Sequence, residues 1–408
     1  MHFRPLTVAE ALRSPGFPGP PCASRPTPLI LDHVDQPLPY RESTSIGLGP
    51  RRPIYFGTLH AHTAGSDGKG SVQKAYRWAR DVAHLDFFAV TDHPEYWLLR
   101  EKNHYAVQQE VARQAARPGF VPIYGFEYSS IVLGHYVVLN APAVRNSFQD
   151  KNLAGFYDWL ARPEQRSALV IFAHPGFHLY RASYEFHHFA FDARLKERMI
   201  GVEVFHWGDY TSFFHGYETG LPYIDEAIAQ GWRVGALASQ DVHNGKWGTR
   251  DGARIALPLP RLNKTEVLAA LKARRFYATD NPDLQLALNV QKPDGDWAGM
   301  GETVHTTAQP SGAFVLKARY YDRGCLTGPY RLEVLVDGQV ASAYETPPPR
   351  IPARTPYAGE LTVNLPLADL PRHAHVYVRF FEGEGPAQKF AESSPIWLDS
   401  ERHPGLKH

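Results

Sequence analysis

The sequence of 408 residues has little cysteine and no excess of charge of either sign. Its two cysteines, Cys22 and Cys325, lie far apart and have no partners at metal-ligand spacing, which argues against a disulfide framework. Lys and Arg total 43 against 42 Asp and Glu, so the net charge of +1 gives no electrostatic signal for nucleic acid. No apolar run reaches the length of a membrane span, and no membrane partner is predicted.

The first residues also lack the apolar core of a secretory signal. They read "MHFRPLTVAEALRSPGFPGPP", and we therefore expect a cytoplasmic location. What the chain does have is histidine, at 20 residues, and the placement of these histidines matters more than their number.

The order of sequence patterns predicts three regions. Residues 1–52 are rich in proline and irregular, as in an arm that wraps the surface of a domain. Residues 53–281 alternate strand and helix patterns, which predicts an α/β domain with a mainly parallel sheet, either open or closed into a barrel. Residues 282–408 alternate apolar and polar residues between turn signals, which predicts an antiparallel β-sandwich whose core includes Phe314, Leu332 and Val334.

Histidines and carboxylates follow nearly every predicted strand of residues 53–281. His60 and His62 form a His-x-His pair, which places both rings on one face of a strand. The carboxyl ends of parallel strands gather at one edge of the sheet, so we expect these side chains to converge there and to bind metal. The candidate ligands are His60, His62, Asp67, His93, Glu127, His135, His174, Asp241 and His243.

Other readings stay open for single residues. Asp67 in "SDG" is typical of a turn, and His135 after a glycine could cap a hairpin. Asp92 should point away from His93, and we interpret it as a carboxylate that orients a ligand histidine. Glu203 is either a buried structural acid or a group that supports the site. His206 and Asp209, which follow the same strand, either face the substrate or are structural.

Six ordered motifs resemble the polymerase and histidinol phosphatase (PHP) family of metal-dependent hydrolases. They are "LHAHTAGSDG", "AVTDH", "GFE", "GHYVV", "AHP" and "QDVH", and they cover residues 54–245. The C-terminal sandwich is most similar to the branch that contains carbamate and ester hydrolases. Two departures are Thr58, where many members carry Asp, and Gln240 in "SQDVH", but the ligand types are kept.

The resemblance implies a distorted (β/α)7 barrel that holds two or three divalent ions of Zn, Mn or Fe. His60, His62, Glu127 and Asp241 would hold the first ion. Glu127 would bridge to a second ion, completed by His135 and His174. Asp67, His93 and His243 would hold a third. A metal-bridging hydroxide would then attack phosphorus or a carbonyl carbon, with Glu127, Asp92, His206 and Asp209 as the candidate catalytic residues.

Aromatic and basic residues in the predicted loops are candidates for substrate binding, although they could simply line the mouth of the barrel. They are Tyr96, Trp97, His178, Tyr180, Arg181, Lys246, Trp247 and Arg250. Such a set suits a small anionic substrate with a ring. Three functions follow in order: a phosphoesterase, a carboxylic ester, amide or carbamate hydrolase on the same ions, and a non-catalytic metal-binding or recognition protein.

Overall fold

The computed structural model describes residues 47–49, 52–99, 103–176, 186–206, 222–249, 252–306, 312–322, 329–346, 357–383 and 388–400. Most of the predicted N-terminal arm lies outside these ranges. So do five candidate site residues, His178, Tyr180, Arg181, Asp209 and Arg250, together with the side chain of His206.

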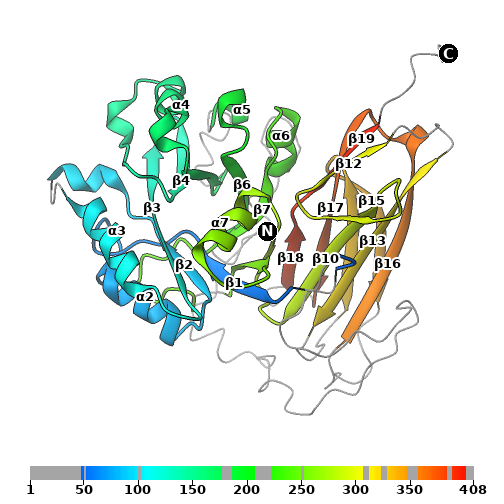
Figure 1. Cartoon of the computed structure of the whole chain (residues 1–408), viewed down its shortest axis with the longest axis horizontal. Coiled ribbons are helices and arrows are strands. Elements are labelled where there is room, and N and C mark those ends of the chain that lie inside the picture. The colour runs from blue at the N-terminus through cyan, green and yellow to red at the C-terminus, as the bar shows by residue number, and fades with distance from the viewer. Residues whose placement is uncertain are drawn as a thin grey trace, which may run out of the picture.

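The first part of the chain alternates strands and helices as predicted, and the helices lie outside its strands in Figure 1. The strands are β1 (Ile54–Thr58), β2 (Phe87–Val90), β3 (Val121–Ser130), β4 (Gly134–Leu139), β5 (Leu169–Ala173), β6 (Met199–His206), β7 (Gly235–Ser239), β8 (Arg254–Pro258) and β9 (Tyr277–Thr279). The α-helices are α2 (Val72–Asp81), α3 (His104–Ala115), α4 (Leu153–Ala161), α5 (Phe186–Phe189), α6 (Tyr223–Ala229) and α7 (Lys264–Lys272). Short 3-10 helices are η1 (Pro94–Leu99), η2 (Ser147–Gln149), η3 (Pro163–Gln165) and η4 (Ala193–Leu195).

The sheet of this part is mixed, which corrects the prediction of a mainly parallel one. The pairs β1–β2, β2–β3, β5–β6 and β6–β7 are parallel, whereas β4 is antiparallel to both β3 and β5, and β8 is antiparallel to β1 and β9. For β4 the reason is the short turn after β3, which allows a hairpin but no crossover helix.

A closed barrel is not shown. The hydrogen-bonded order runs from β9 through β8 and β1 to β7. Among the described residues, a single parallel bridge, Ala61 to Val242, joins the segment after β1 to the segment after β7. This bridge places the segment after β7 beside the segment after β1. The candidate ligands Asp241 and His243 therefore lie next to His60 and His62.

Helix α2 shows how local sequence positions this part. Ser71, the predicted cap, accepts a hydrogen bond from the Lys74 amide at 3.3 Å. Val72, Ala75, Tyr76 and Ala79 recur at helical spacing and are buried, as the amphipathic pattern requires.

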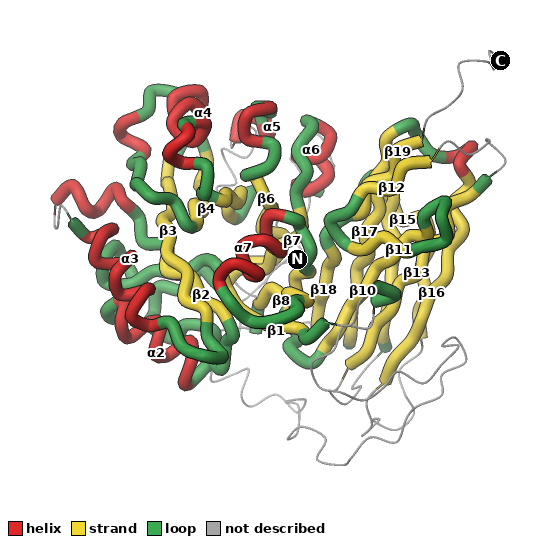
Figure 2. The backbone as a smooth tube through the Cα atoms, in the orientation of Figure 1, coloured by secondary structure: helices red, strands yellow, loops and turns green. Residues whose placement is uncertain are grey.

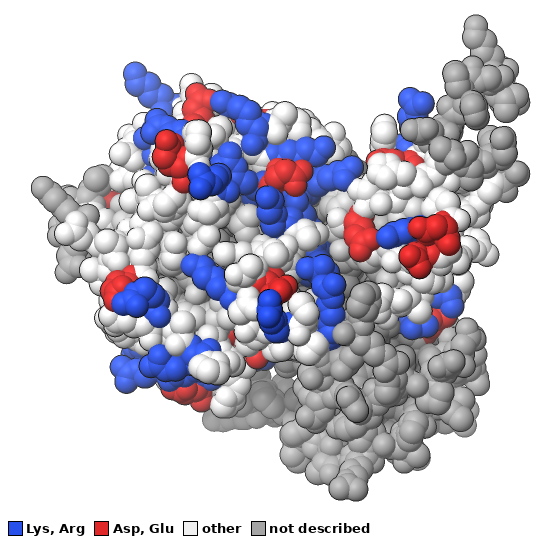
Figure 3. Space-filling model, in the orientation of Figure 1, with Lys and Arg blue, Asp and Glu red and all other residues white. Residues whose placement is uncertain are grey.

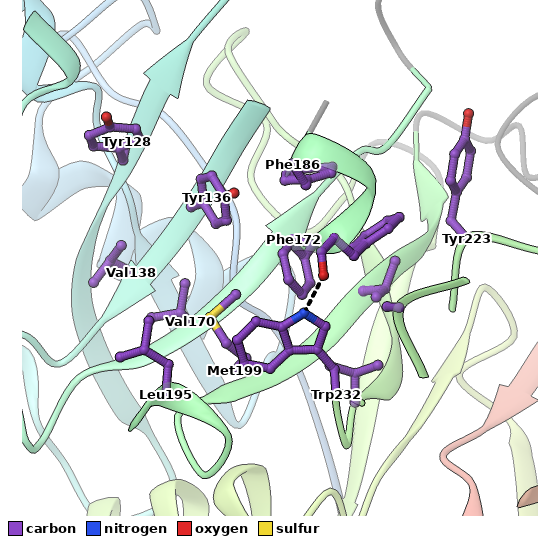
Figure 4. Close-up of a cluster of buried hydrophobic side chains, with 14 of the residues drawn as sticks. Tyr128, Tyr136, Val138, Val170, Phe172, Phe186, Leu195, Met199, Tyr223 and Trp232 are labelled. Atoms are coloured by element: carbon purple, nitrogen blue, oxygen red, sulfur yellow. Dashed lines mark hydrogen bonds between the residues drawn. The ribbon is translucent and has the colours of Figure 1, made fainter. Parts of the chain in front are cut away.

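A large aromatic core fills the space between β3–β6 and the helices that cover them. In Figure 4, Tyr128, Tyr136 and Phe172 lie on three of these strands, and Phe172 lies close to the buried Trp232. The Trp232 indole donates to the Phe189 carbonyl at 2.7 Å, so its one polar atom is satisfied inside the core. Strands β3, β4 and β5, which carry or precede candidate ligands, are therefore held in place by a buried aromatic core.

The second part of the chain is a pair of packed sheets, on the right of Figures 1 and 2. Its elements are β10 (Leu284–Gln291), β11 (Trp297–Gly299), β12 (Thr303–Thr306), β13 (Ala313–Asp322), β14 (Tyr330–Val336), β15 (Gln339–Thr346), β16 (Tyr357–Pro366), η6 (Leu367–Asp369), β17 (His373–Glu382), β18 (Lys389–Ser393) and β19 (Ile396–Ser400). One sheet has the order β11-β10-β13-β16 and is antiparallel, and the facing sheet contains one parallel pair, β12–β19. Phe314, Leu332 and Val334 are buried, which confirms them as core residues.

The two parts share one continuous sheet. Strand β18 pairs with β9 through Ala391–Thr279, Glu392–Ala278 and Ser393–Tyr277. The apolar cluster of the second part also includes Ile54, Ala256 and Tyr277 from the first. The predicted boundary between residues 281 and 282 marks a change of sequence pattern. The residues on its two sides pack into a shared hydrophobic core. None of the described helices is long and apolar enough to cross a membrane.

Candidate metal centre

The candidate ligands come from the ends of six strands. His60 and His62 follow β1, His93 follows β2, His174 follows β5, and Asp241 and His243 follow β7. Glu127 lies within β3, three residues before its end, and His135 is the second residue of β4. Because β4 is antiparallel to β3, its first residues lie at the edge where β3 ends, and Ser129 stands opposite His135. The reversed strand thus brings His135 to the same edge as the others.

The first group contains His60, His62, Glu127 and Asp241. Glu127 Oε2 lies 3.0 Å from His60 Nε2 and 3.1 Å from His62 Nε2. Asp241 Oδ1 lies 2.8 Å from His62 Nε2 and 3.3 Å from His60 Nε2, and the two Nε2 atoms are 3.2 Å apart. All four side chains are buried. Four ligand atoms therefore converge on one point.

The second group lies on the other side of Glu127. Its Oε1 atom is 2.8 Å from His135 Nδ1 and 3.1 Å from His174 Nε2. The two carboxylate oxygens of Glu127 thus face different groups of histidines.

The third group contains His62, Asp67, His93 and His243. Asp67 lies 3.3 Å from His243 Nε2, 3.7 Å from His93 Nε2 and 3.9 Å from His62 Nδ1. Asp67 therefore does not act only as a turn residue. His62 belongs to two groups, because Nε2 faces the first and Nδ1 faces the third.

The donor set fits divalent transition-metal ions. In a tetrahedral site with metal–ligand bonds of 2.0–2.1 Å, ligand atoms lie about 3.3 Å apart. The five distances in the first group, 2.8–3.3 Å, are close to that spacing. In addition, His62 Nδ1 is buried and has no hydrogen-bond partner among the described residues, as expected of an atom that serves a ligand.

The carboxylates hold protons on the histidines when no ion is bound. Burial lowers the pKa of His62, but the hydrogen bonds and charges of Asp241 and Glu127 outweigh it and raise the pKa to about 10. Burial also lowers the pKa of His60, but Glu203, Asp241 and Glu127 leave it well above its usual value. Burial is the main reason that the pKa of His93 falls to about 4. His60 and His62 are therefore protonated at neutral pH when no ion is bound, whereas His93 is neutral.

We expect metal uptake in the first group to release protons. An ion must displace the protons of His60 and His62, so its affinity should rise with pH, by roughly 10- to 100-fold per unit for one or two protons. The rise should flatten as the pH approaches the His62 pKa of about 10. Calorimetric titration of the metal-free protein in buffers of different ionisation enthalpy measures the proton count. An affinity independent of pH between 6 and 9 would contradict this protonation state.

Asp92 has a different role from the predicted one. Its Oδ1 accepts the Thr63 amide at 2.6 Å and the Ser66 hydroxyl at 2.8 Å, and its Oδ2 accepts the Thr63 hydroxyl at 2.6 Å. The ring of His104 is 3.4 Å away, and no metal-ligand histidine is among these partners. Asp92 therefore organises the loop between His62 and Asp67 rather than a ligand ring.

Asp92→Asn should act through that loop. An amide NH₂ would replace one acceptor among these donors, which costs about 1–3 kcal/mol of folding free energy. Displacement of Asp67 should lower turnover by roughly 10- to 100-fold. The control is Asp86→Asn, because Asp86 accepts the Phe56 amide at 2.7 Å at the other end of β2. Equal losses of turnover in both variants would mean that Asp92 has no specific link to the site.

The predicted substrate residues that are described fall into two classes. Tyr96 is 41% exposed, and its ring lies 5.9 Å from that of His93, while Lys246 is exposed. Trp97 and Trp247 are buried, and their indoles donate to the Gly65 carbonyl at 3.1 Å and the His62 carbonyl at 2.9 Å. These two tryptophans are buried against the backbone of the ligand loop, whereas the sequence predicted that they contact substrate or line the mouth of the barrel.

Two further polar residues contact the ligands: sequence reasoning missed Ser129 and left the role of Glu203 open. Ser129 Oγ lies 2.6 Å from His93 Nδ1, and Glu203 Oε1 lies 2.9 Å from His60 Nδ1. For Ser129 the available signal was its position two residues after Glu127, on the same face of β3. Glu203 was considered with a structural role as the alternative, and its contact with His60 spans 143 residues of sequence.

Two solved structures are similar to this chain at low sequence identity. No protein-family model and no curated protein matches the chain. A solved structure from Bacteroides vulgatus, described as a two-domain protein containing a predicted PHP-like metal-dependent phosphoesterase, matches 89% of this chain and 99% of its own, with 14% identity and a TM-score of 0.47. Endonuclease Q in complex with a 27-mer duplex with an abasic lesion matches 54% of this chain and 56% of its own, with 13% identity and a TM-score of 0.35.

Proposed function

We propose that this chain is a PHP-type metal-dependent hydrolase, and that its substrates are phosphate esters. The observation that carries the proposal is Glu127. Its two oxygens face two separate histidine groups at 2.8–3.1 Å, which is the arrangement of a carboxylate shared by two ions. Its burial among five histidines supports a metal role over a purely structural one.

The residues of the chain would hold the ions and leave the exposed side for substrate. His60, His62, Glu127 and Asp241 would hold the first ion, and Glu127 with His135 and His174 the second. Asp67, His93 and His243 would hold a third, with His62 Nδ1 turned toward it. When bound, such ions supply Lewis acidity and lower the pKa of water. The most exposed members, Asp67 and His243, mark the side from which a substrate enters.

Charge balance favours anionic substrates. Three divalent ions against Asp67, Glu127, Asp241 and the adjoining Glu203 would leave a net charge of about +2. Two ions against the same carboxylates would leave no excess, so the preference for phosphate depends on the third group. On the face shown in Figure 3, basic and acidic side chains are interspersed.

A substrate panel tests the proposal. The protein is loaded with Zn, Mn or Fe and assayed on nitrophenyl phosphate, bis-nitrophenyl phosphate, nitrophenyl acetate and an abasic-site duplex. We expect turnover of a phosphate ester, abolished by chelation and restored by metal. Turnover of the acetate alone would establish the ester hydrolase instead. Tight metal binding with no turnover of any substrate would favour the non-catalytic reading.

A further inference from the structure

We infer that Glu203 is a positioning residue that links the first and second groups from behind. It lies in β6 and is buried, and it reaches both groups through different oxygens. Oε1 lies 2.9 Å from His60 Nδ1, and Oε2 accepts the backbone amide of His174 at 2.9 Å. This inference rests on the metal centre of the proposed function and adds a residue outside its ligand set.

The contact with His60 decides which ring nitrogen is available. A carboxylate at Nδ1 keeps a proton on that atom, so an ion that displaces the proton of Nε2 finds the lone pair of Nε2 beside Glu127 and Asp241. Without an acceptor at Nδ1, the neutral ring could carry its proton on Nε2, where it would block an ion. Glu203 thus selects the tautomer that the first group needs.

The contact with His174 fixes a strained backbone. His174 has φ of +31°, a region that residues with side chains seldom adopt. The Glu203 carboxylate accepts its amide there and so holds the turn that aims the ring at Glu127 Oε1, 3.1 Å away. One carboxylate therefore orients a ring in the first group and a main chain in the second.

The pairing also explains why a buried acid is tolerated at this position. An unpaired buried carboxylate is costly, but both oxygens of Glu203 have short hydrogen-bonded partners. Glu127 and Glu203 lie on opposite sides of the His60 ring, since one contacts Nε2 and the other Nδ1. His60 is thereby clamped between two carboxylates that reach it from β3 and β6.

Glu203→Gln separates this role from a structural one. A Gln side chain has one oxygen and one NH₂ group, so it can accept from His60 or from His174 but not from both. If the NH₂ faces His60, it donates to Nδ1 and drives the proton to Nε2. We expect the affinity for ions in the first and second groups to fall by roughly 10- to 100-fold. Chelator competition and metal content measure this, and the d–d absorption of bound Co²⁺ should change in intensity because the ligand geometry changes.

Two variants complete the test. Glu392→Gln is the control, because Glu392 is also buried but pairs with Arg379 at 2.7 Å in the second part of the chain. Glu203→Asp retains the charge with a shorter reach, should recover one contact, and should give an intermediate affinity. It also serves if the Gln variant does not fold.

The outcomes distinguish this inference from the proposed function. Loss of affinity and an altered Co²⁺ spectrum in Glu203→Gln, with normal circular dichroism, support the positioning role even if no panel substrate is turned over. Unchanged metal affinity and spectrum in the folded variant, with only a lower unfolding temperature, would overturn it and leave the hydrolase proposal standing. Failure of the unmodified protein to bind any ion would overturn both.

Discussion

Glu127→Gln should abolish turnover and deplete both ions that Glu127 would share. Oε2 contacts His60 and His62, and Oε1 contacts His135 and His174, so one substitution alters two pockets. Gln keeps the shape but offers one neutral oxygen and an NH₂ group that repels a cation. Loss of one such electrostatic element costs on the order of 10²-fold or more in rate. Turnover of the best panel substrate, metal content and circular dichroism are measured together.

Glu360→Gln is the matched control for this variant. Glu360 pairs with Lys317 at 2.8 Å and with Arg319 in the second part of the chain. Its substitution therefore removes a paired carboxylate without changing the candidate metal ligands. Its metal content and turnover should be those of the unmodified protein. A Glu127→Gln protein with full activity and full metal content would mean that Glu127 is a structural acid and that the shared-ion proposal is wrong.

His62→Ala should have the second-largest effect, because His62 takes part in two groups. Its Nε2 lies 2.8 Å from Asp241 and 3.1 Å from Glu127, and its Nδ1 is turned toward Asp67 at 3.9 Å. Its ring also stacks between His93 and His243, at centroid distances of 4.3 and 4.2 Å. Removing the ring should empty the first pocket, weaken the third, and lower turnover by roughly 10²-fold or more.

His135→Ala is the informative comparison, since His135 contacts Glu127 Oε1 and belongs to the second group only. We expect it to lose one ion and His62→Ala to lose more than one, as measured by metal analysis after gel filtration. If both variants lose a single ion and their remaining ions bind equally well, His62 serves one pocket and the double assignment fails.

Part of the site followed from the sequence alone. Most of the ligand types stand near a strand end, and neighbouring strand ends share one edge, so local patterns predicted that His60, His62, His93, Glu127 and Asp241 converge. The division of the ligands among separate ions was implied by the family resemblance. Period-two alternation also placed Phe314, Leu332 and Val334 in the core of the second part. These features depend on near neighbours in the chain, which a sequence displays.

Other features depend on contacts that no local pattern encodes. The reversal of β4 brings His135 to the ligand edge, and the β9–β18 pairing joins two sequence-defined regions into one sheet. Asp92 was expected to orient a ring, but the fold of the loop at Thr63 and Ser66 supplies closer donors. Glu203 reads as one more acid in an apolar strand until β6 brings it to His60 and His174. The sequence therefore determined which residue types could bind metal, and only the tertiary structure decided their partners, because hydrogen bonds form between atoms that are close in space however distant they are along the chain.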